Sequence, residues 1–289
     1  MKRTRTLRPF CLLMILCLNL TACKASTSEP KFAYWADNAP AVSNLQEYVQ
    51  DVTNEKSGNF IPEKDRIAVF DMDGTLYGEK APIYIEWLLF QYRVLEDADY
   101  DAPDDVKAVA EKIKLAIETG TIPEELEREH AYASAKAFAG MTLEEHREYV
   151  NAFIRRDAEG FDGLTYAKAW YWPMLEVIDY LNKNDFTVYI CSGTDRFLCR
   201  ALAEGILDVP DEHFIGMDVF LEASGQNGID GLDYVYSAAD EVVRTDRLII
   251  KNVKANKVSQ IAQEIGRQPV LVFGNSSGDT SMAMYVTSD

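Results

Sequence analysis

The spacing of apolar residues changes twice along the chain. Residues 67–70 form a short apolar run that is typical of a buried strand. From residue 80 to residue 184, apolar residues recur at intervals of three and four, which predicts helices. Short apolar runs return at 186–191, 213–223 and 269–273, with helical patterns between them. Strands that alternate with helices indicate an α/β fold with a parallel sheet covered on both faces.

The helical stretch separates the first predicted strand from the second. It is too long to be a simple crossover between neighbouring strands, so we interpret residues 80–185 as an inserted all-helical domain. The remaining core comprises residues 41–79 and 186–289. Within that core, residues 227–236 are rich in Gly and Asp and predict a turn-rich hairpin.

The N-terminus has the features of an export signal. An apolar run from Phe10 to Leu20 follows four basic residues, Lys2, Arg3, Arg5 and Arg8. This run is shorter than the roughly 20 residues that span a bilayer. Small residues and Cys23 come next, in the order Leu-Thr-Ala-Cys. We therefore predict a signal peptide over residues 1–22 and a tether over residues 23–40.

The stretch Leu-Thr-Ala-Cys resembles the cleavage site of a bacterial lipoprotein. The resemblance implies that Cys23 is acylated and anchors the protein to the bacterial cell envelope, with membrane contact only through the lipid. An uncleaved membrane anchor and an ordinary secretory signal are the alternatives. All three place the folded domain outside the cytoplasm.

The charge of the chain excludes one class of partner. The formal net charge is −18, and removal of residues 1–22, which contain four basic and no acidic residues, takes it to −22. Such a surface repels nucleic-acid phosphates, and no basic stripe interleaved with aromatic residues is present. We therefore predict that nucleic acid is not a partner.

The cysteines and histidines of the folded region show no metal-ligand spacing. Cys191 and Cys199 are predicted to be small buried apolar residues rather than a disulfide or a zinc site. His130, His146 and His213 are expected to have surface or packing roles.

Aromatic residues gather in two stretches of the helical region. One contains Tyr84, Trp87, Phe90 and Tyr92, and the other spans residues 170–172. We expect them to belong to the core. An aromatic box for a choline-like cation is the alternative interpretation.

Unusual polar residues follow the predicted strands. Asp71 and Asp73 come directly after the first strand, Ser192 follows the second, and Asp279 lies shortly after the last. In open α/β sheets, ligands bind beyond the carboxyl ends of the strands. Two carboxylates at the end of a buried strand become tolerable if a cation lies between them. The pattern therefore predicts a cation-binding site at this edge of the sheet.

The stretch Asp71-Met72-Asp73-Gly74-Thr75 resembles motif I, DxDGT, of the haloacid dehalogenase-like hydrolases. The resemblance implies that Asp71 is a nucleophile, that Asp73 is a general acid and base, and that Thr75 binds phosphate. Motif II of the family is a Ser or Thr after an apolar strand. It corresponds to Ser192, which with the N–H of Gly193 would bind a phosphate oxygen.

The third motif of the family is a lysine. Lys251, Lys254 and Lys257 all compete for this role. The phosphoserine phosphatase branch has a similar lysine-alanine step before the last motif, which implies that Lys254 stabilises the nucleophile and the transferred phosphoryl group. Lys257 is expected to be solvated.

The fourth motif of the family is usually GDxxxD. Here it is Gly274-Asn275-Ser-Ser-Gly-Asp279, with an amide at the first acidic position. An amide oxygen coordinates Mg²⁺ without contributing negative charge. The resemblance implies that Asp71, the Asp73 carbonyl, Asn275 and Asp279 surround Mg²⁺, directly or through water.

The resemblance implies a Rossmann-like core with a helical C1 cap over residues 80–185. It also implies a Mg²⁺-dependent phosphomonoester hydrolase that forms an aspartyl-phosphate on a small phosphoserine- or phosphocholine-like substrate. A catalytically weakened phosphate-ligand-binding lipoprotein, suggested by Asn275, and a phosphotransferase are the alternatives. The chain stops ten residues after Asp279, where the family continues, so we expect its C-terminus to be truncated.

Overall fold

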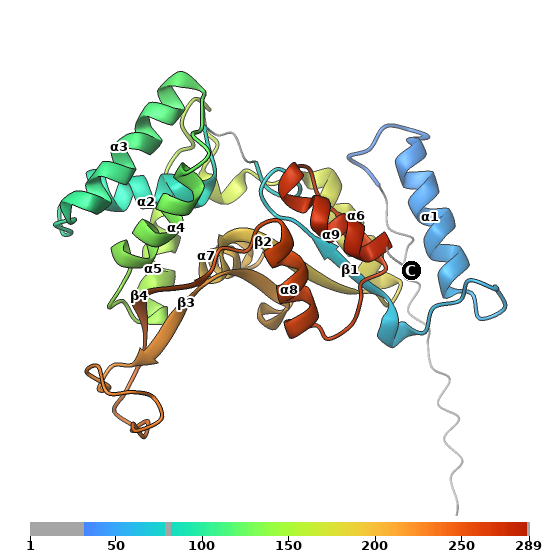
Figure 1. The fold of residues 1–289 in the computed structure, drawn as a ribbon. Coiled ribbons are helices and arrows are strands. Elements are labelled where there is room, and N and C mark those ends of the chain that lie inside the picture. Colours follow the sequence, from blue (N-terminus) through green and yellow to red (C-terminus); the bar gives the residue numbers. More distant parts are fainter. Residues whose placement is uncertain (1–31, 79–81, 288–289) are drawn as a thin grey trace, which may run out of the picture. The chain divides into compact units, whose positions relative to one another are not determined.

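The computed structural model describes residues 32–78 and 82–287 (Figure 1). A five-stranded sheet lies at its centre, in the order β4-β3-β2-β1-β5. The strands are β1 (Ile67–Phe70), β2 (Thr187–Asp195), β3 (Phe214–Ala223), β4 (Val242–Ile250) and β5 (Leu271–Phe273). β1 pairs in parallel with β2 and β5, and β2 pairs in parallel with β3. The predicted α/β fold with a mostly parallel sheet is confirmed.

The described helices are α1 (Pro40–Thr53), α2 (Ile85–Leu95), α3 (Asp104–Thr119), α4 (Leu126–Ala137), α5 (Leu143–Ile154), α6 (Trp172–Lys183), α7 (Arg196–Ala203), α8 (Ala255–Glu264) and α9 (Thr280–Thr287). We call α2 to α5 and their connections the helical insertion. It follows β1 in the chain, and in Figure 1 it lies beside β3 and β4. Its helix α4 packs against β4, and α5 packs against α7.

Both faces of the sheet are covered, which explains the continuous apolar run of β1. Ile67 and Val69 pack in one cluster with residues of α8 and α9. Ala68 and Phe70 point to the other face, where they join a larger cluster that includes α6 and α7. Since successive side chains of a strand alternate between faces, all four residues are buried. The strand therefore ends in a dry environment, at Asp71.

Local sequence signals account for several helix ends. At α5, the Thr142 hydroxyl accepts a hydrogen bond from the Glu145 N–H, and the Glu145 carboxylate accepts one from the Thr142 N–H. This is a reciprocal capping box. At α7, the Asp195 carboxylate accepts hydrogen bonds from the N–H groups of Phe197 and Leu198. The helix α7 therefore begins directly after Asp195.

The hairpin predicted at residues 227–236 is absent from the described structure, which has turns and irregular backbone there. Instead, residues 242–250 form β4, an edge strand antiparallel to β3. The hydrophobic pattern missed β4 because a charged residue, Arg244, occupies one of its buried positions and is only 1% exposed. Arg244 Nη2 lies 2.6 Å from the Asp195 carboxylate, so tertiary ion pairing allows its burial.

Residues 1–31 include the predicted signal peptide, Cys23 and most of the tether, and they lie outside the described residues. Within the part of the chain that is described, no helix combines the length and the hydropathy needed to cross a membrane.

Two of the three histidines have packing roles in the core. His130 is fully buried between the rings of Trp87 and Phe90, and burial lowers its pKa well below its usual value. His146 is 1% exposed and contacts the ring of Phe138 edge to face. Burial lowers the pKa of His146 to about 3, helped by the charge of Arg244 and opposed by that of Asp195. Both histidines are therefore neutral in the folded protein at neutral pH.

We expect the variant His146→Leu to lose less stability on acidification than the wild-type protein. Between the usual histidine pKa of 6.5 and the folded value of about 3, only the unfolded chain protonates at this position, so stability falls as the pH falls. At pH 5.0 the loss relative to pH 7.5 is about 2 kcal/mol from this group. The free energy of unfolding in urea, measured at both pH values, tests this.

The variant Phe138→Leu serves as the control, because it removes the ring contact but keeps the histidine. It should retain the wild-type pH dependence. An equal loss of stability on acidification in His146→Leu and in the wild-type protein would contradict the presence of a buried neutral histidine at this position.

Candidate active site

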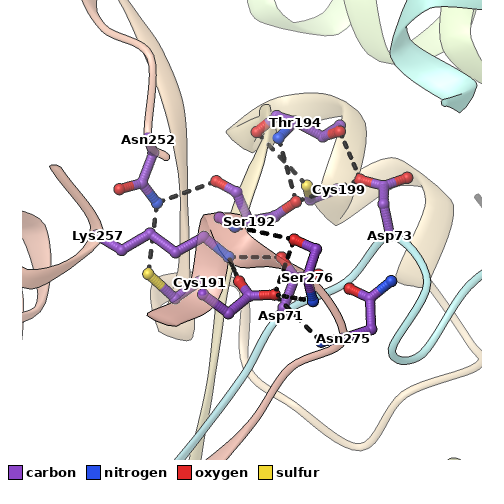
Figure 2. Close-up of polar contacts among 12 residues, drawn as sticks. Asp71, Asp73, Cys191, Ser192, Thr194, Cys199, Asn252, Lys257, Asn275 and Ser276 are labelled. Carbon is purple, nitrogen blue, oxygen red and sulfur yellow. Dashed lines mark hydrogen bonds and ion pairs between the residues drawn. The ribbon is translucent and has the colours of Figure 1, made fainter. Parts of the chain in front are cut away.

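Polar residues directly after β1, in the last part of β2 and in the loop after β5 meet at one edge of the sheet, as Figure 2 shows. Asp71 is connected to the end of β5, since its N–H donates to the Phe273 carbonyl over 2.8 Å. Asp71, Asp73, Ser192 and Asp279 are all less than 9% exposed. Side chains from three distant parts of the sequence thus share one buried site.

Lys257 connects two of these carboxylates. Its Nζ lies 2.5 Å from Asp71 Oδ1 and 2.7 Å from Asp279 Oδ1. Lys257 and Asp71 are both labelled in Figure 2. Burial opposes the charged form of Lys257, but the negative charge of Asp71, supported by Asp279, raises its pKa above the usual value. Burial also raises the pKa of Asp71 to about 6, against the effect of Lys257. At neutral pH the ion pair is therefore charged on both sides.

The expectation that Lys257 is solvated is wrong, because its side chain is only 2% exposed. α8 begins at Ala255, so Lys257 lies in its first turn and shares a buried face with Gln260 and Ile261. Lys254 precedes the helix, is exposed, and adopts a positive φ of 55°. The structure brings Lys257, rather than Lys254, to Asp71. In the sequence, Lys257 stands three and four residues before Gln260 and Ile261. This spacing places the three side chains on one face of a helix, and it was the signal that Lys257 is buried.

The loop after β5 surrounds the Asp279 carboxylate. Asp279 Oδ2 accepts hydrogen bonds from the N–H groups of Asn275 and Ser276, at 3.2 and 3.1 Å, and from the Ser276 hydroxyl. A Cβ on Gly274 would lie 2.7 Å from the Cβ of Asp279, which is too close. Only glycine lets the loop approach the carboxylate in this way. Both Asp279 oxygens are thereby oriented, one by the loop and one by Lys257.

Asp73 lies in a different environment. Its Oδ2 accepts a hydrogen bond of 2.7 Å from the Thr194 hydroxyl, and Ser192 Oγ lies 3.4 Å away. Burial, and next the charge of Asp71, raise the pKa of Asp73 to about 7, while the hydrogen bond from Thr194 opposes the shift. Asp73 Oδ1 and Thr75 Oγ1 are buried and have no hydrogen-bond partner among the described residues. A carboxyl group with this pKa can exchange a proton near neutral pH.

The family resemblance assigned motif II, near the end of β2, to Ser192. In the structure, Thr194 makes the shorter hydrogen bond to Asp73, and its N–H donates to Ser192 Oγ at 3.1 Å. The side-chain amide of Asn252 donates to the Ser192 carbonyl at 3.0 Å. No sequence motif marked Thr194 or Asn252 as a site residue, because both act through contacts that form only in the tertiary structure.

A cavity of about 340 Å³ opens beside these residues. Asp71, Asp73, Lys257 and Asp279 line it, together with Gly193, Lys254 and the loop 276–278. The helical insertion contributes the opposite wall, including Glu86 of α2. Glu86 is 2% exposed and accepts hydrogen bonds from Lys251 Nζ at 2.8 Å and from the Asp195 N–H at 3.2 Å. A cavity of this size accommodates a small ligand.

The oxygen donors that the sequence predicted around Asp71 are of the types that a hard divalent cation prefers. Within the described residues, no group of three or more His, Cys, Asp and Glu side chains is arranged to hold a metal ion. The candidate set, however, also draws on the Asp73 carbonyl and the Asn275 amide, and oxygen donors of these types are those that Mg²⁺ takes. Asp279 already accepts four hydrogen bonds, so it fits a role through water or through Lys257 better than direct coordination.

Comparison with known proteins identifies the family. The model of the haloacid dehalogenase-like hydrolases matches residues 68–284. The match spans the sheet, the helical insertion and every site residue described above. The chain therefore belongs to this family of hydrolases, and the motif resemblance is confirmed at that level.

One solved structure with a TM-score above 0.5 supports the fold, and two others are similar at lower scores. A conserved protein of unknown function from Anaerococcus prevotii DSM 20548 is similar with a TM-score of 0.51 and 14% identity, over 84% of this chain and 81% of that chain. Cytosolic 5′-nucleotidase IIIB bound to cytidine gives a TM-score of 0.49 and 15% identity, over 86% and 75% of the two chains. A phosphoserine phosphohydrolase-like protein from Francisella tularensis gives 0.32 and 15%, over 54% and 59%. No curated protein matched the chain.

We expect the variant Lys257→Met to be strongly destabilised. It leaves Asp71 and Asp279 buried without their counter-charge, and loss of one partner of a buried ion pair costs about 3 kcal/mol or more. The matched variant Lys254→Met removes an exposed lysine and should change the free energy of unfolding by less than about 0.5 kcal/mol. Denaturant unfolding at pH 8 measures both.

The double variant Lys257→Met, Asp71→Asn should recover part of the loss, since it removes one of the two uncompensated carboxylates. Equal effects of the two lysine variants on the free energy of unfolding would contradict the ion-pair arrangement.

Proposed function

We propose that this protein hydrolyses small phosphomonoesters through an aspartyl-phosphate on Asp71. The observation that supports this most directly is the buried Lys257 ammonium between Asp71 and Asp279, next to Asp73 in the same cavity. Membership of a family of hydrolases supports a hydrolytic reaction, and two carboxyl groups with different environments allow different roles.

In the first step, an Asp71 carboxylate oxygen attacks phosphorus and the ester bond breaks. The departing alkoxide takes a proton from Asp73, whose raised pKa favours the protonated form. In the second step, Asp73 accepts a proton from water while the water oxygen attacks phosphorus. Inorganic phosphate leaves, and the Asp71 carboxylate and the Asp73 proton are restored.

Lys257 keeps Asp71 ionised and fixes its orientation, because it donates to one oxygen of the carboxylate. The N–H of Gly193 and the side chains of Ser192, Thr75 and Lys254 are proposed to contact the phosphoryl oxygens. Gly193 and Lys254 line the cavity, and the Thr75 hydroxyl is buried close to the Asp73 turn. Of the three candidate lysines, Lys251, Lys254 and Lys257, Lys254 is the exposed one, so it suits capture of an incoming anion.

Mg²⁺ is proposed as the cofactor, held by Asp71, the Asp73 carbonyl and Asn275, with Asp279 acting through water. When bound, the ion would offset negative charge on the phosphoryl oxygens. Asn275 supplies a neutral oxygen where the family usually has a carboxylate, so the proposed ligands of Mg²⁺ carry one negative charge fewer than those of the usual motif.

We also propose that the protein is a lipoprotein anchored in the bacterial envelope through Cys23. The order of basic, apolar and small residues before Cys23 supports this.

We expect the wild-type chain, expressed in a bacterial host with a labelled fatty acid, to incorporate the label and to sediment with membranes. The variant Cys23→Ser should do neither, because it lacks the thiol that the lipid requires. Cys11→Ser, within the signal peptide, is the matched control. Label incorporation by Cys23→Ser would contradict the anchor.

Activity is tested by release of inorganic phosphate from p-nitrophenyl phosphate and other small esters with Mg²⁺. Turnover should require Mg²⁺ and should fall by about a thousandfold or more in Asp71→Asn, because the amide is a poor nucleophile. Asp233→Asn, in the exposed loop 224–241, is the matched control and should keep wild-type turnover.

Circular dichroism must show that Asp71→Asn is folded. Phosphate binding without turnover in the wild-type protein would contradict the hydrolase and favour the binding-protein alternative.

A further inference from the structure

The last part of β2 departs from regular strand pairing where it reaches the site. Between Cys191 and Asp195 the chain advances four residues, whereas its partner β3 advances only two. The extra residues, 192–194, form a bulge, and a bulge leaves backbone groups without ladder partners. Because buried backbone groups need hydrogen bonds, this stretch must find partners elsewhere in the fold.

Glu86 of α2 supplies one of these partners from the helical insertion. Its Oε1 accepts a hydrogen bond of 3.2 Å from the backbone N–H of Asp195, directly after the bulge. Its Oε2 accepts one of 2.8 Å from Lys251 Nζ. This ammonium group compensates the charge of a side chain that is only 2% exposed. Glu86 therefore joins the end of β2 to the segment that follows β4.

The segment after β4 also contacts the bulge directly. The side-chain amide of Asn252 donates to the Ser192 carbonyl at 3.0 Å. Val253 packs so closely that a Cβ on Gly193 would lie 2.9 Å from its Cγ1. The bulge is thus held by side chains from two distant segments, and Glu86 is the one that belongs to the helical insertion.

The bulge positions the hydroxyl groups that contact Asp73. Thr194 Oγ1 donates to Asp73 Oδ2 over 2.7 Å, as Figure 2 shows. Ser192 Oγ lies 3.4 Å from the same oxygen. The other oxygen, Asp73 Oδ1, is buried and has no hydrogen-bond partner among the described residues. Since Asp73 lines the cavity, Oδ1 is the oxygen left to give a proton to a departing alcohol.

We infer that Glu86 is a positioning residue for proton transfer by Asp73. Its carboxylate holds the Asp195 N–H and thereby fixes the bulge, and the bulge places the Thr194 hydroxyl against Asp73 Oδ2. Asp73 Oδ1 then stays free for the leaving group. The inference rests on the phosphomonoesterase function proposed above and adds to it a residue of the helical insertion that acts through Thr194. Small displacements of a reacting group lower rates strongly, so such support matters.

The leaving group of the ester distinguishes this role from a purely structural one. The alkoxide of glycerol needs a proton as it departs, whereas p-nitrophenolate is a stable anion and needs none. Misplacement of Asp73 should therefore slow the hydrolysis of glycerol 3-phosphate much more than that of p-nitrophenyl phosphate. The test compares kcat/KM for the two esters, because this quantity includes the step in which the alcohol leaves.

Two matched double variants remove the ion pair and differ in one acceptor. Glu86→Leu with Lys251→Met eliminates both charges and the acceptor for the Asp195 N–H. Glu86→Gln with Lys251→Met eliminates the same charges but keeps an amide oxygen at that place. The first should lower kcat/KM for glycerol 3-phosphate about tenfold or more relative to p-nitrophenyl phosphate, mainly through kcat. The second should keep the wild-type ratio within about threefold.

Glu96→Gln is the control for loss of a carboxylate at the other end of α2. Glu96 is exposed and pairs with Arg156 rather than with the end of β2, so both kcat/KM values should be kept. Thr194→Val removes the hydroxyl but keeps the shape of the side chain, and it tests the contact with Asp73 independently of the ion pair. It should show the same selective loss on glycerol 3-phosphate. Melting temperatures show that each variant is folded.

The outcomes separate the inference from the proposed function. The same ratio in the two double variants, or an equal loss on both esters, would overturn the inference and leave the hydrolase intact. An equal loss on both esters in Thr194→Val would also overturn it, even if the variant with leucine at position 86 did not fold. Hydrolysis of neither ester by the wild-type protein would overturn the proposed function itself.

Discussion

The site depends on one ammonium group placed between two buried carboxylates. Lys257 donates to both Asp71 and Asp279, and all three side chains are less than 10% exposed. In the low dielectric of the interior, either carboxylate alone would be strongly destabilised. The ammonium group lowers this cost and keeps Asp71 charged. Buried ion pairs rarely add stability over apolar packing, so the arrangement is better explained by chemistry that needs an ionised carboxylate.

Three separate parts of the fold are required for this contact. β1 delivers Asp71 at its carboxyl end, α8 supplies Lys257 from its first turn, and the loop after β5 turns the Asp279 carboxylate inwards. The close approach of Gly274 to Asp279 and the hydrogen bonds from the loop backbone hold that carboxylate in place. Each element alone would leave a charge without its partner.

The helical insertion is connected to this site through polar contacts as well as apolar packing. Glu86 of α2 accepts hydrogen bonds from Lys251 and from the Asp195 N–H, both of which belong to the core. Asp195 in turn pairs with the buried Arg244 of β4. A chain of polar contacts thus extends from the cavity wall to the edge of the sheet. It connects helix α2 of the insertion to the core.

The sequence by itself determined the α/β class and the helices between β1 and β2, and it predicted a site at the carboxyl end of β1. Short apolar runs and the Asp71-x-Asp73 pair are local patterns, and local patterns suffice for these features. Only the tertiary structure decided that Lys257 rather than Lys254 contacts Asp71, that Thr194 donates to Asp73, and that Arg244 is buried in an edge strand. A charged side chain is buried when a partner from a distant segment compensates its charge, and hydropathy along the chain carries no information about that partner.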